Sequence, residues 1–396
     1  MKILILGAGQ VGSSAAYHLS REEAHEVTVV DMRAEVLREL QDRLDIRTVV
    51  GHAAYPDILE RAGADDADII VALTDTDETN MVACQVAYTL YHTPTKIARI
   101  RSAEYMTARK LFTQDAIPVD VRISPEQLVC EYIEQLILYP GALQVLDFAE
   151  GRVRLVGARA DRRGSLVGQK IAALKEHIPN TEGRIAAIYR DGKSIKPEGD
   201  TIIKDGDEVF FIAARQDVRV FMSEMRHLED PVRRVVIAGG GNIGVRLALA
   251  LEQTNQVKII ERDPDRARHI SEQLNKAIVL VGDAADEELL LGENIDNVDV
   301  FCGLTNAEEA NILSSMLAKR LGAQKAMALI NRPSYAELVE SGSIDIAISP
   351  QQVTIGSLLA HVRRGDVVKV HSLKRGAAEA IEAVAHGDQQ SSNVVG

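Results

Sequence analysis

The chain opens with an apolar run followed by a glycine-rich turn, Ile3-Leu4-Ile5-Leu6-Gly7-Ala8-Gly9-Gln10-Val11-Gly12. The turn fits the pattern G-x-G-x-x-G, in which a buried strand passes through a tight turn into a helix. The free amide groups at the start of that helix can face a pyrophosphate. The pattern occurs again after a second apolar strand, as Gly239-Gly240-Gly241-Asn242-Ile243-Gly244. The doubled fingerprint predicts two nucleotide-binding units of Rossmann type, with every residue of both turns a candidate for cofactor binding.

Each glycine of such a turn has its own task. The first allows the tight turn, the second lets the backbone approach the pyrophosphate, and the third lets the helix pack on the sheet. An acid follows each turn at close to the expected spacing of about 20 residues, namely Asp31 and Glu261. We expect both carboxylates to accept hydrogen bonds from ribose hydroxyls and to repel a 2′-phosphate, which favours NAD or an adenine nucleotide over NADP. The alternatives are a solvated charge at these positions and a degenerate unit kept as scaffold.

Apolar runs alternate with helical patterns in the same order after both turns. In the first copy, strands are expected at residues 3–6, 26–30, 48–50, 68–73, 96–100 and 119–123. In the second copy they are expected at residues 235–238, 258–260, 278–281, 298–304, 328–330 and 344–348. This alternation predicts the α/β class with two Rossmann-like, doubly wound parallel sheets, each followed by a small α+β lobe.

The expected domain organisation follows the repeat. It comprises a first Rossmann unit (1–125), a crossover helix (126–149), a first small lobe (150–228), a second Rossmann unit (232–350), a second crossover helix (351–365) and a second small lobe (366–396). The first small lobe has strand-like runs at 153–156, 185–189 and 208–213, separated by Asp-Gly turns. The final Val394-Val395-Gly396 is similar to Leu166-Val167-Gly168 inside that lobe. We therefore expect the second lobe to be truncated.

Other candidate binding residues follow further strands. Carboxyl ends of strands bind ligands in open α/β sheets, and these ends carry Leu73, Thr74, Leu304 and Thr305. The next strand ends at Arg99 and Arg101, which are expected to reach phosphates, whereas the second copy has Leu329 and Asn331 there. After the third strand of each copy come His52 and Asp283, which are expected to line an adenosine pocket. The alternative for all these outer positions is an ordinary loop residue.

Composition excludes several function classes. The chain has 396 residues and a net charge of −13, which argues against nucleic acid and anionic lipid as partners. A redox-sensing repressor would also need a basic recognition helix, which is missing. Cys84, Cys130 and Cys302 share no C-x-x-C spacing, so neither a disulfide framework nor a metal site is expected. No apolar run approaches the ~18 residues of a membrane span, and a cytosolic protein is expected.

Catalytic residues are not expected. Tyr189 and Lys193 match Y-x-x-x-K, but an Asp-Gly turn separates them, whereas a catalytic pair of this kind needs one helical turn. A soluble NAD-dependent oxidoreductase stays the alternative function. Two helices with broad apolar faces, at 126–138 and 351–362, are either packed internally or used for assembly.

In combination, three stretches carry a resemblance to a known family. They are the first turn with Asp31, Ala72-Leu73-Thr74-Asp75-Thr76-Asp77-Glu78-Thr79-Asn80, and Gly303-Leu304-Thr305-Asn306-Ala307-Glu308-Glu309-Ala310-Asn311. The chain resembles the TrkA family, the peripheral nucleotide-binding subunits of bacterial Trk potassium-uptake systems, built from two tandem RCK (KTN) domains. It departs from the family pattern at Asn331, where a basic residue is expected.

The resemblance implies a regulatory function without catalysis. It implies binding of NAD(H) and of ATP or ADP at the carboxyl edges of the sheets. It also implies a homo-oligomer formed through RCK domains, expected as a tetrameric ring, on a TrkH-like membrane potassium-translocating subunit. Ligand exchange would change the ring and gate transport from the cytoplasmic face of the inner membrane. Because of Asn331, the two sites are not expected to be equal.

Overall fold

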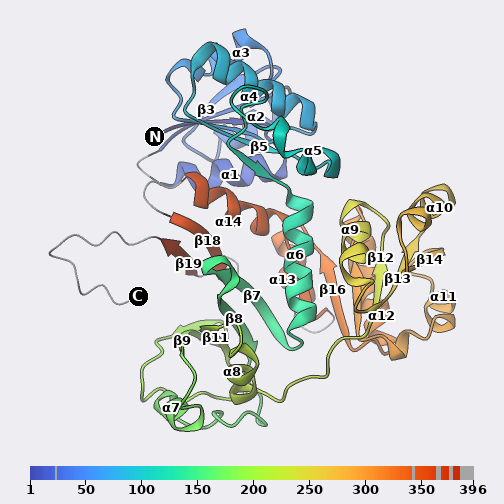
Figure 1. Ribbon diagram of the computed structural model, residues 1–396. Helices are drawn as coiled ribbons and strands as arrows, with labels where there is room; N and C mark the ends of the chain where they lie inside the picture. Colours follow the sequence, from blue (N-terminus) through green and yellow to red (C-terminus); the bar gives the residue numbers. More distant parts are fainter. Residues whose placement is uncertain (23–24, 341–343, 363–366, 374–377, 384–396) are drawn as a thin grey trace. The chain divides into compact units, whose positions relative to one another are not determined.

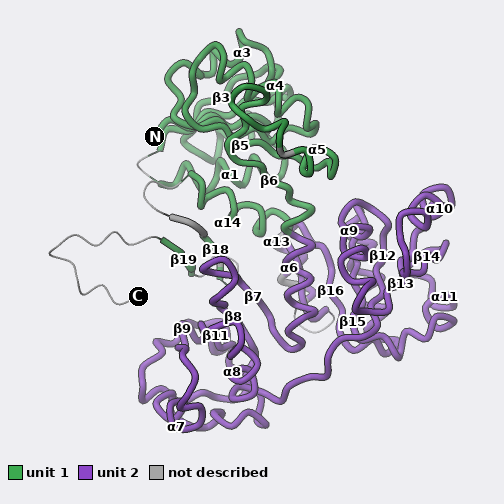
Figure 2. The backbone as a smooth tube through the Cα atoms, viewed as in Figure 1, with its two compact units in different colours: residues 1–128, 350–396 green, residues 129–349 purple. Residues whose placement is uncertain are grey.

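The computed structural model describes residues 1–396 apart from 23–24, 341–343, 363–366, 374–377 and 384–396 (Figure 1). The described chain forms two compact units, one made of residues 1–128 and 350–396 and the other of residues 129–349 (Figure 2). Within the described residues, no helix is long and apolar enough to cross a membrane.

The first unit contains a six-stranded parallel sheet in the order β3-β2-β1-β4-β5-β6. Its strands are β1 (Lys2–Leu6), β2 (Glu26–Asp31), β3 (Arg47–Val50), β4 (Ile69–Ala72), β5 (Thr95–Arg99) and β6 (Val121–Ile123). Its helices are α1 (Gln10–Ser20), α2 (Ala34–Gln41), α3 (Pro56–Arg61), α4 (Asp77–Tyr91) and α5 (Ala103–Thr107). The central strands are buried on both faces, as their aliphatic sequences require.

The second unit repeats this topology in the order β14-β13-β12-β15-β16-β17, again with parallel pairs. Its strands are β12 (Arg234–Ala238), β13 (Gln256–Glu261), β14 (Ile278–Val281), β15 (Val300–Gly303), β16 (Lys325–Leu329) and β17 (Ile346–Ile348). Its helices are α9 (Asn242–Leu251), α10 (Pro264–Gln273), α11 (Glu287–Gly292), α12 (Glu308–Arg320) and α13 (Pro333–Glu340). The predicted α/β class with two doubly wound sheets is confirmed.

The small lobe of the second unit is an antiparallel sheet in the order β10-β9-β11-β8-β7. Its strands are β7 (Ala142–Phe148), β8 (Val153–Arg159), β9 (Gly183–Arg190), β10 (Lys193–Ile195) and β11 (Glu208–Ala214), with helices α7 (Leu174–His177) and α8 (Val218–Met225). Helix α8 packs on the sheet through Phe221, whose ring stacks on Phe211 at 5.3 Å between centroids. The structure adds β7 and β10 to the three strands predicted from the sequence. Residues 126–149 were expected to form a crossover helix, with the lobe beginning at residue 150, but residues 142–148 form an edge strand of the lobe's sheet. Pro140 and Gly141, the latter with a φ of +87°, end the helical path before this strand.

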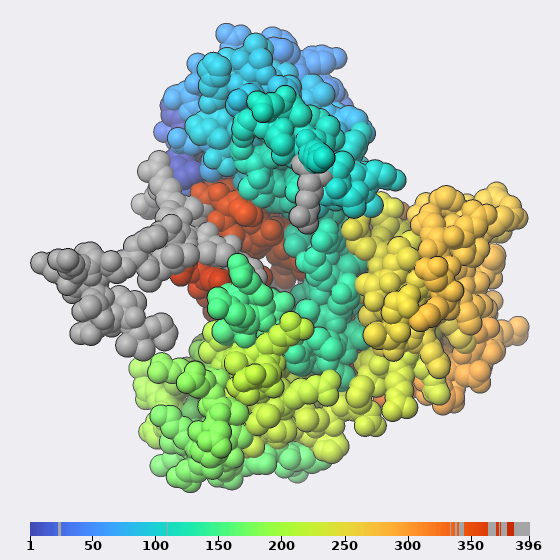
Figure 3. Space-filling view, viewed as in Figure 1, coloured from blue at the N-terminus to red at the C-terminus, as the bar shows by residue number. Residues whose placement is uncertain are grey.

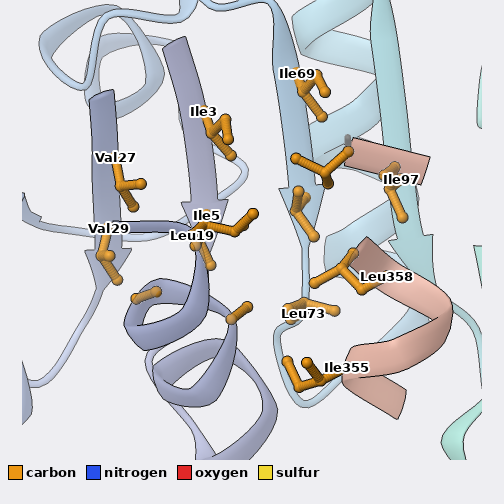
Figure 4. Close-up of a cluster of buried hydrophobic side chains, with 14 of the residues drawn as sticks. Ile3, Ile5, Leu19, Val27, Val29, Ile69, Leu73, Ile97, Ile355 and Leu358 are labelled. Atoms are coloured by element: carbon orange, nitrogen blue, oxygen red, sulfur yellow. The ribbon is translucent and has the colours of Figure 1, made fainter. Parts of the chain in front are cut away.

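Helix α14 (Pro350–Val362) follows the second repeat but packs on the sheet of the first. Ile355 and Leu358 lie in one buried cluster with Ile3, Ile5 and Leu19 (Figure 4). Figure 3 shows the red surface of this helix directly below the blue surface of the first unit. The core of the first unit is therefore completed by residues from the far end of the chain.

Helix α6 (Pro125–Leu138) is the corresponding helix after the first repeat, and most of it belongs to the second unit. Its residues Val129, Ile133 and Leu136 are buried, and the Cys130 thiol donates to the carbonyl of Ile243 at 3.3 Å. Each crossover helix thus contacts the Rossmann unit of the other repeat, which is internal packing for both apolar faces.

The described part of the second small lobe is a two-stranded antiparallel sheet of β18 (Val367–Leu373) and β19 (Ala378–Ala383). Strand β18 passes so close to α14 that a Cβ on Gly356 would lie 2.6 Å from the carbonyl oxygen of Val370. The predicted match between Val394-Val395-Gly396 and Leu166-Val167-Gly168 lies outside the described residues.

Candidate functional site

The first and third glycines of each turn are required by the folded chain itself. Gly7 has a φ of +101° and Gly239 a φ of +109°, a backbone region that favours glycine. A Cβ on Gly12 would lie 1.9 Å from the carbonyl oxygen of Gly7, and one on Gly244 would lie 2.0 Å from that of Gly239. The turn and the helix therefore pack backbone to backbone at both sites.

The second glycine of each turn has no such reason to be glycine. Gly9 and Gly241 are the N-cap residues of α1 and α9, with φ of −68° and −71° in the extended region that any residue adopts. A Cβ on either would meet no heavy atom of the described chain within 4 Å. Neither packing nor backbone strain calls for glycine there, so the empty side of the turn suits the close approach of a bound group.

The acids at the ends of β2 and β13 hold the turns in place. Asp31 accepts a hydrogen bond from the amide of Ala8 at 2.7 Å, and Glu261 accepts one from the amide of Gly240 at 2.8 Å. The second oxygen of each carboxylate accepts from the amide two residues further on, that of Arg33 or Asp263. Carboxylate oxygens have further lone pairs, so both acids are in position to accept ribose hydroxyls as well.

A buried asparagine organises the loop after β4. Asn80, at the start of α4, is fully buried and accepts from both the amide and the hydroxyl of Thr74, at 2.9 and 2.7 Å. Its amide group donates to the carbonyl of Arg99 at 2.9 Å, which ties the ends of β4 and β5 together. Thr74 is thus brought to the carboxyl edge beside the glycine-rich turn, where a Cβ on Gly7 would lie 3.0 Å from its amide nitrogen.

The second copy builds the same network. Asn311 accepts from the amide and hydroxyl of Thr305 at 2.7 and 2.6 Å and donates to the carbonyl of Leu329 at 3.2 Å. The sequence showed these asparagines as matching positions but not as part of the site. The signal in the sequence that could have identified them was the same polar residue at corresponding positions of the two repeats.

Replacing Asn80 with alanine is expected to destabilise the first unit by about 3 kcal/mol, because a buried amide and a carbonyl lose their partners. Asn311→Ala is the matched variant and should cost the second unit a similar amount. Hydrogen exchange in urea, followed separately for the strands of each sheet, measures both. Equal protection of β4 in the parent chain and in Asn80→Ala would contradict the prediction.

Asp77, in the first turn of α4, fixes the loop after β5. Asp77 accepts from the amides of Arg101 and Ser102 at 2.9 and 2.8 Å. The guanidinium of Arg101 donates to the carbonyl of Asp75 and lies 3.8 Å from the Asp77 carboxylate. Arg101 therefore sits at the carboxyl edge, with its charge already directed towards the loop of α4.

In the second copy, Glu308 accepts from the amides of Asn331 and Arg332 at 3.0 and 2.9 Å. Asn331 thus occupies the place of Arg101, as the sequence comparison assumed. A basic side chain is nevertheless present one position later, because Arg332 contacts the carboxylates of Glu308 and Glu309 at 3.5 and 3.0 Å. Arg332 is not among the binding residues predicted from the sequence.

The side chain of Arg99 pairs with a residue of α6 and not with the glycine-rich turn. Its guanidinium lies 3.4 Å from the carboxylate of Glu126 at the start of α6, and its Nε is buried without a hydrogen-bond partner. The corresponding Leu329 is buried. Phosphate binding by Arg99 therefore stays a prediction that the observed pairing does not favour.

His52 and Asp283 occupy equivalent turns after β3 and β14. The Nδ1 atom of His52 accepts from the amide of Ala54 at 3.3 Å, and Asp283 accepts from the amide of Ala285 at 2.9 Å. Because β3 pairs with β2 and β14 pairs with β13, these turns follow strands that neighbour the ones ending at Asp31 and Glu261.

Two further features lie away from these edges. A cavity of about 430 Å³ in the second unit is lined by residues where β15, β16 and β17 begin, including Lys325, and by none of the predicted binding residues. Tyr189 and Lys193 lie on β9 and β10, joined by a hairpin turn in which Asp191 and Gly192 both have positive φ. This Y-x-x-x-K match is therefore not one helical turn.

Comparison with protein families identifies both kinds of lobe. The TrkA-N domain model matches residues 3–125 and 235–350, and the TrkA-C domain model matches residues 155–226. A Trk system potassium uptake protein TrkA from Halomonas elongata is 60% identical over 396 residues, covering 100% of this chain and 86% of that protein. The protein of the same name from Vibrio alginolyticus is 59% identical over 397 residues, with the same coverage.

Solved structures of GsuK, among them its RCK domain, have a similar fold. The RCK domain of GsuK superposes with a TM-score of 0.67 at 18% identity, covering 91% of this chain and 77% of that one. The GsuK channel bound to NAD has a TM-score of 0.67 at 18% identity, and GsuK bound to ADP has 0.56 at 17%. Each covers 91% of this chain, and 64% and 70% of those chains respectively. At these identities the likeness shows the fold.

Proposed function

This chain belongs to the TrkA family of Trk potassium-uptake proteins, and on that premise we propose that it binds NAD(H) and adenine nucleotides such as ATP and ADP at both glycine-rich turns and gates a membrane potassium-translocating subunit. Relatives in the family are named for potassium uptake, and the RCK neighbours support a regulatory subunit. The proposed partner is a TrkH-like subunit, with the chain peripheral on the cytoplasmic face of the inner membrane.

The proposal of nucleotide binding rests on the second glycine of each turn. Gly9 and Gly241 are glycines that neither the backbone nor the packing of the described chain requires. They adjoin helix starts, where free amide groups and the helix dipole favour a phosphate. The residues that fit NAD or an adenine nucleotide are thus the turn for the pyrophosphate and Asp31 or Glu261 for the ribose.

The candidate reactive side chains of the described chain favour gating over catalysis. Burial raises the pKa of both the Cys84 and the Cys302 thiol to about 12, so neither supplies a thiolate nucleophile at neutral pH. The Tyr189–Lys193 match lies on a hairpin of the small lobe. A ligand that only binds can still shift a conformational equilibrium, by as much as its affinities for the two states differ.

The test is potassium flux through the membrane subunit reconstituted with the full chain, as NADH, ADP and ATP are varied. We expect flux to depend on nucleotide when the parent chain is present. We expect this dependence to be lost when both turns are blocked at Gly9 and Gly241. The proposal fails if the blocked chain gives the same nucleotide-dependent flux. Substrate-dependent turnover of NADH by the isolated chain would instead favour an oxidoreductase.

For assembly, we propose that copies of this chain form the expected tetrameric ring through α4 and α12. These helices are equivalent, and they expose apolar side chains at the same position, Val82 at 49% and Leu313 at 61%. An apolar residue exposed at one place in both copies of a repeat points to a surface that both copies use.

Replacing Val82 and Leu313 with lysine is expected to raise the concentration for half-assembly by about tenfold or more, because unpaired charges would enter a buried contact. Analytical ultracentrifugation gives the oligomer size. Leu291→Lys is the control, since Leu291 is 53% exposed on α11 and the equivalent residue of the first copy is already charged, as Glu60. If the control dissociates the oligomer as strongly, α4 and α12 are not the contact.

A further inference from the structure

The two candidate sites differ at the edge where the adenosine end of a nucleotide would lie. In the first copy β2 and β3 pair with Asp31 opposite Val50, and in the second β13 and β14 pair with Glu261 opposite Val281. Because the register is the same, the residues that follow these strands correspond one to one. His52 and Tyr55 in the first copy therefore correspond to Asp283 and Asp286 in the second.

The first copy presents an aromatic surface at this edge. The rings of His52 and Tyr55 lie 4.6 Å apart between centroids, tilted by 31°. Tyr55 is 57% exposed, and Met32, the residue after Asp31, is 66% exposed. Exposed flat and polarizable side chains beside a ribose-binding acid suit a planar base.

Tyr55 occupies a position where a side chain that caps the helix would be favourable. Tyr55 is the N-cap residue of α3 and makes no side-chain hydrogen bond to the helix. Asp286 at the same place caps α11, accepting from the amides of Glu288 and Leu289 at 2.9 and 3.4 Å. Aspartate is among the preferred N-cap residues and tyrosine is not. The first copy thus lacks a stabilising cap contact at the position where it exposes an aromatic ring.

The neighbouring helix shows the same difference. Asp263 caps α10, accepting from the amides of Asp265 and Arg266 at 2.9 and 3.0 Å. Arg33 is the N-cap residue of α2 and makes no side-chain cap contact. Both helix starts at this edge are capped by aspartate in the second copy, and neither is capped by a side chain in the first.

The second copy presents charges instead of rings. Arg266 donates from Nε to the carbonyl of Gly240 at 3.0 Å, which places its guanidinium on the glycine-rich turn. The corresponding residue of the first copy is Val36, which packs against the core. Together with Arg262, Asp283 and Asp286, Arg266 makes this edge polar.

We propose that the first site recognises the adenine base by stacking on the Tyr55–His52 pair, whereas the second site holds nucleotides by ribose and phosphate without recognising the base. This inference rests on the proposed nucleotide binding and adds which site reads the base. Adenine nucleotides then fill the first site at a lower concentration than nucleotides with other bases do. The second site responds to nucleotide diphosphates of any base.

The test is calorimetry with ADP and UDP on the full chain, with one site blocked at a time. With the second site blocked by Gly241→Asp, we expect ADP to bind the first site about tenfold more tightly than UDP, because a pyrimidine stacks less well. With the first site blocked by Gly9→Asp, the two affinities should agree within about twofold. An ADP preference of equal size at both sites would overturn the proposal.

Variants at the aromatic pair separate stacking from a structural effect. Tyr55→Asp with His52→Asp should remove the ADP preference of the first site, and Tyr55→Phe should keep it. The reciprocal pair Asp283→His with Asp286→Tyr should install a preference in the second site. A Tyr55→Phe chain that loses the preference as fully as the aspartate variant would overturn stacking.

Two readouts keep the outcomes distinct. Melting curves without nucleotide show whether a variant is folded. If an aspartate variant does not fold, Tyr55→Leu takes its place, because leucine keeps an apolar side chain without a ring. If neither ADP nor NADH binds either site of the parent chain, the proposed function itself fails. If both bind but neither site distinguishes ADP from UDP, nucleotide binding stands and only the base-reading proposal is overturned.

Discussion

A chain carrying Gly9→Asp and Gly241→Asp is expected to fold like the parent chain and to bind NADH, ADP and ATP about 100-fold or more weakly. Both positions are N-caps in the extended region, with no heavy atom of the described chain within 4 Å of an added Cβ. Aspartate is a good N-cap, so stability should change by only a few tenths of a kcal/mol. The added carboxylate would occupy the pyrophosphate position and repel it.

Isothermal titration measures the affinity, and thermal unfolding without nucleotide measures the fold. Gly9→Asn with Gly241→Asn is the matched control, because asparagine has the same shape and capping ability without the charge. We expect the asparagine chain to lose less affinity than the aspartate chain. Unchanged affinity in the aspartate chain would show that nucleotides do not bind at these turns.

Gly12→Ala, three residues further along the same turn, is expected to have the opposite outcome, with destabilisation of the first unit by on the order of 3 kcal/mol or more. The new Cβ would lie 1.9 Å from the carbonyl oxygen of Gly7, a backbone atom that no rotamer change can move. Gly7 is itself held at a φ of +101°. The helix must therefore shift away from the sheet.

Denaturant unfolding followed by hydrogen exchange of β1 measures this loss, and Gly244→Ala should repeat it in the second unit, at 2.0 Å from Gly239. Gly292→Ala is the control, since a Cβ there meets nothing within 4 Å at the last position of α11. That change should be neutral or slightly stabilising. Protection of β1 equal to that of the parent chain would contradict the close packing of turn and helix.

The succession of strands and helices along the chain was predictable because buried parallel strands are continuous aliphatic runs. Strand β14 (Ile278–Val281) has the bounds predicted from the sequence. Strand β7 (Ala142–Phe148) was missed, because its sequence Ala-Leu-Gln-Val-Leu-Asp-Phe is neither a continuous aliphatic run nor a strict alternation of apolar and polar residues.

The helix partners could not be predicted in the same way. An apolar helical face shows that α14 is buried but not on which sheet, since Ile355 and Leu358 fit either aliphatic surface. Aligning the two repeats correctly places Asn331 at the position of Arg101. This alignment did not indicate that Arg332, one position later, contacts Glu308 with its side chain. Side-chain direction, unlike periodicity, depends on the folded loop.

The packing of α14 on the first sheet also has a consequence for how the protein is made. Strands β1 to β6 are synthesised first, but their buried cluster includes Leu359 and Val362. Until these residues leave the ribosome, Ile3, Ile5 and Leu19 lack part of their apolar cover. The two repeats therefore do not complete their cores one after the other during translation, because the core of the first Rossmann sheet includes a helix that is synthesised after the second repeat.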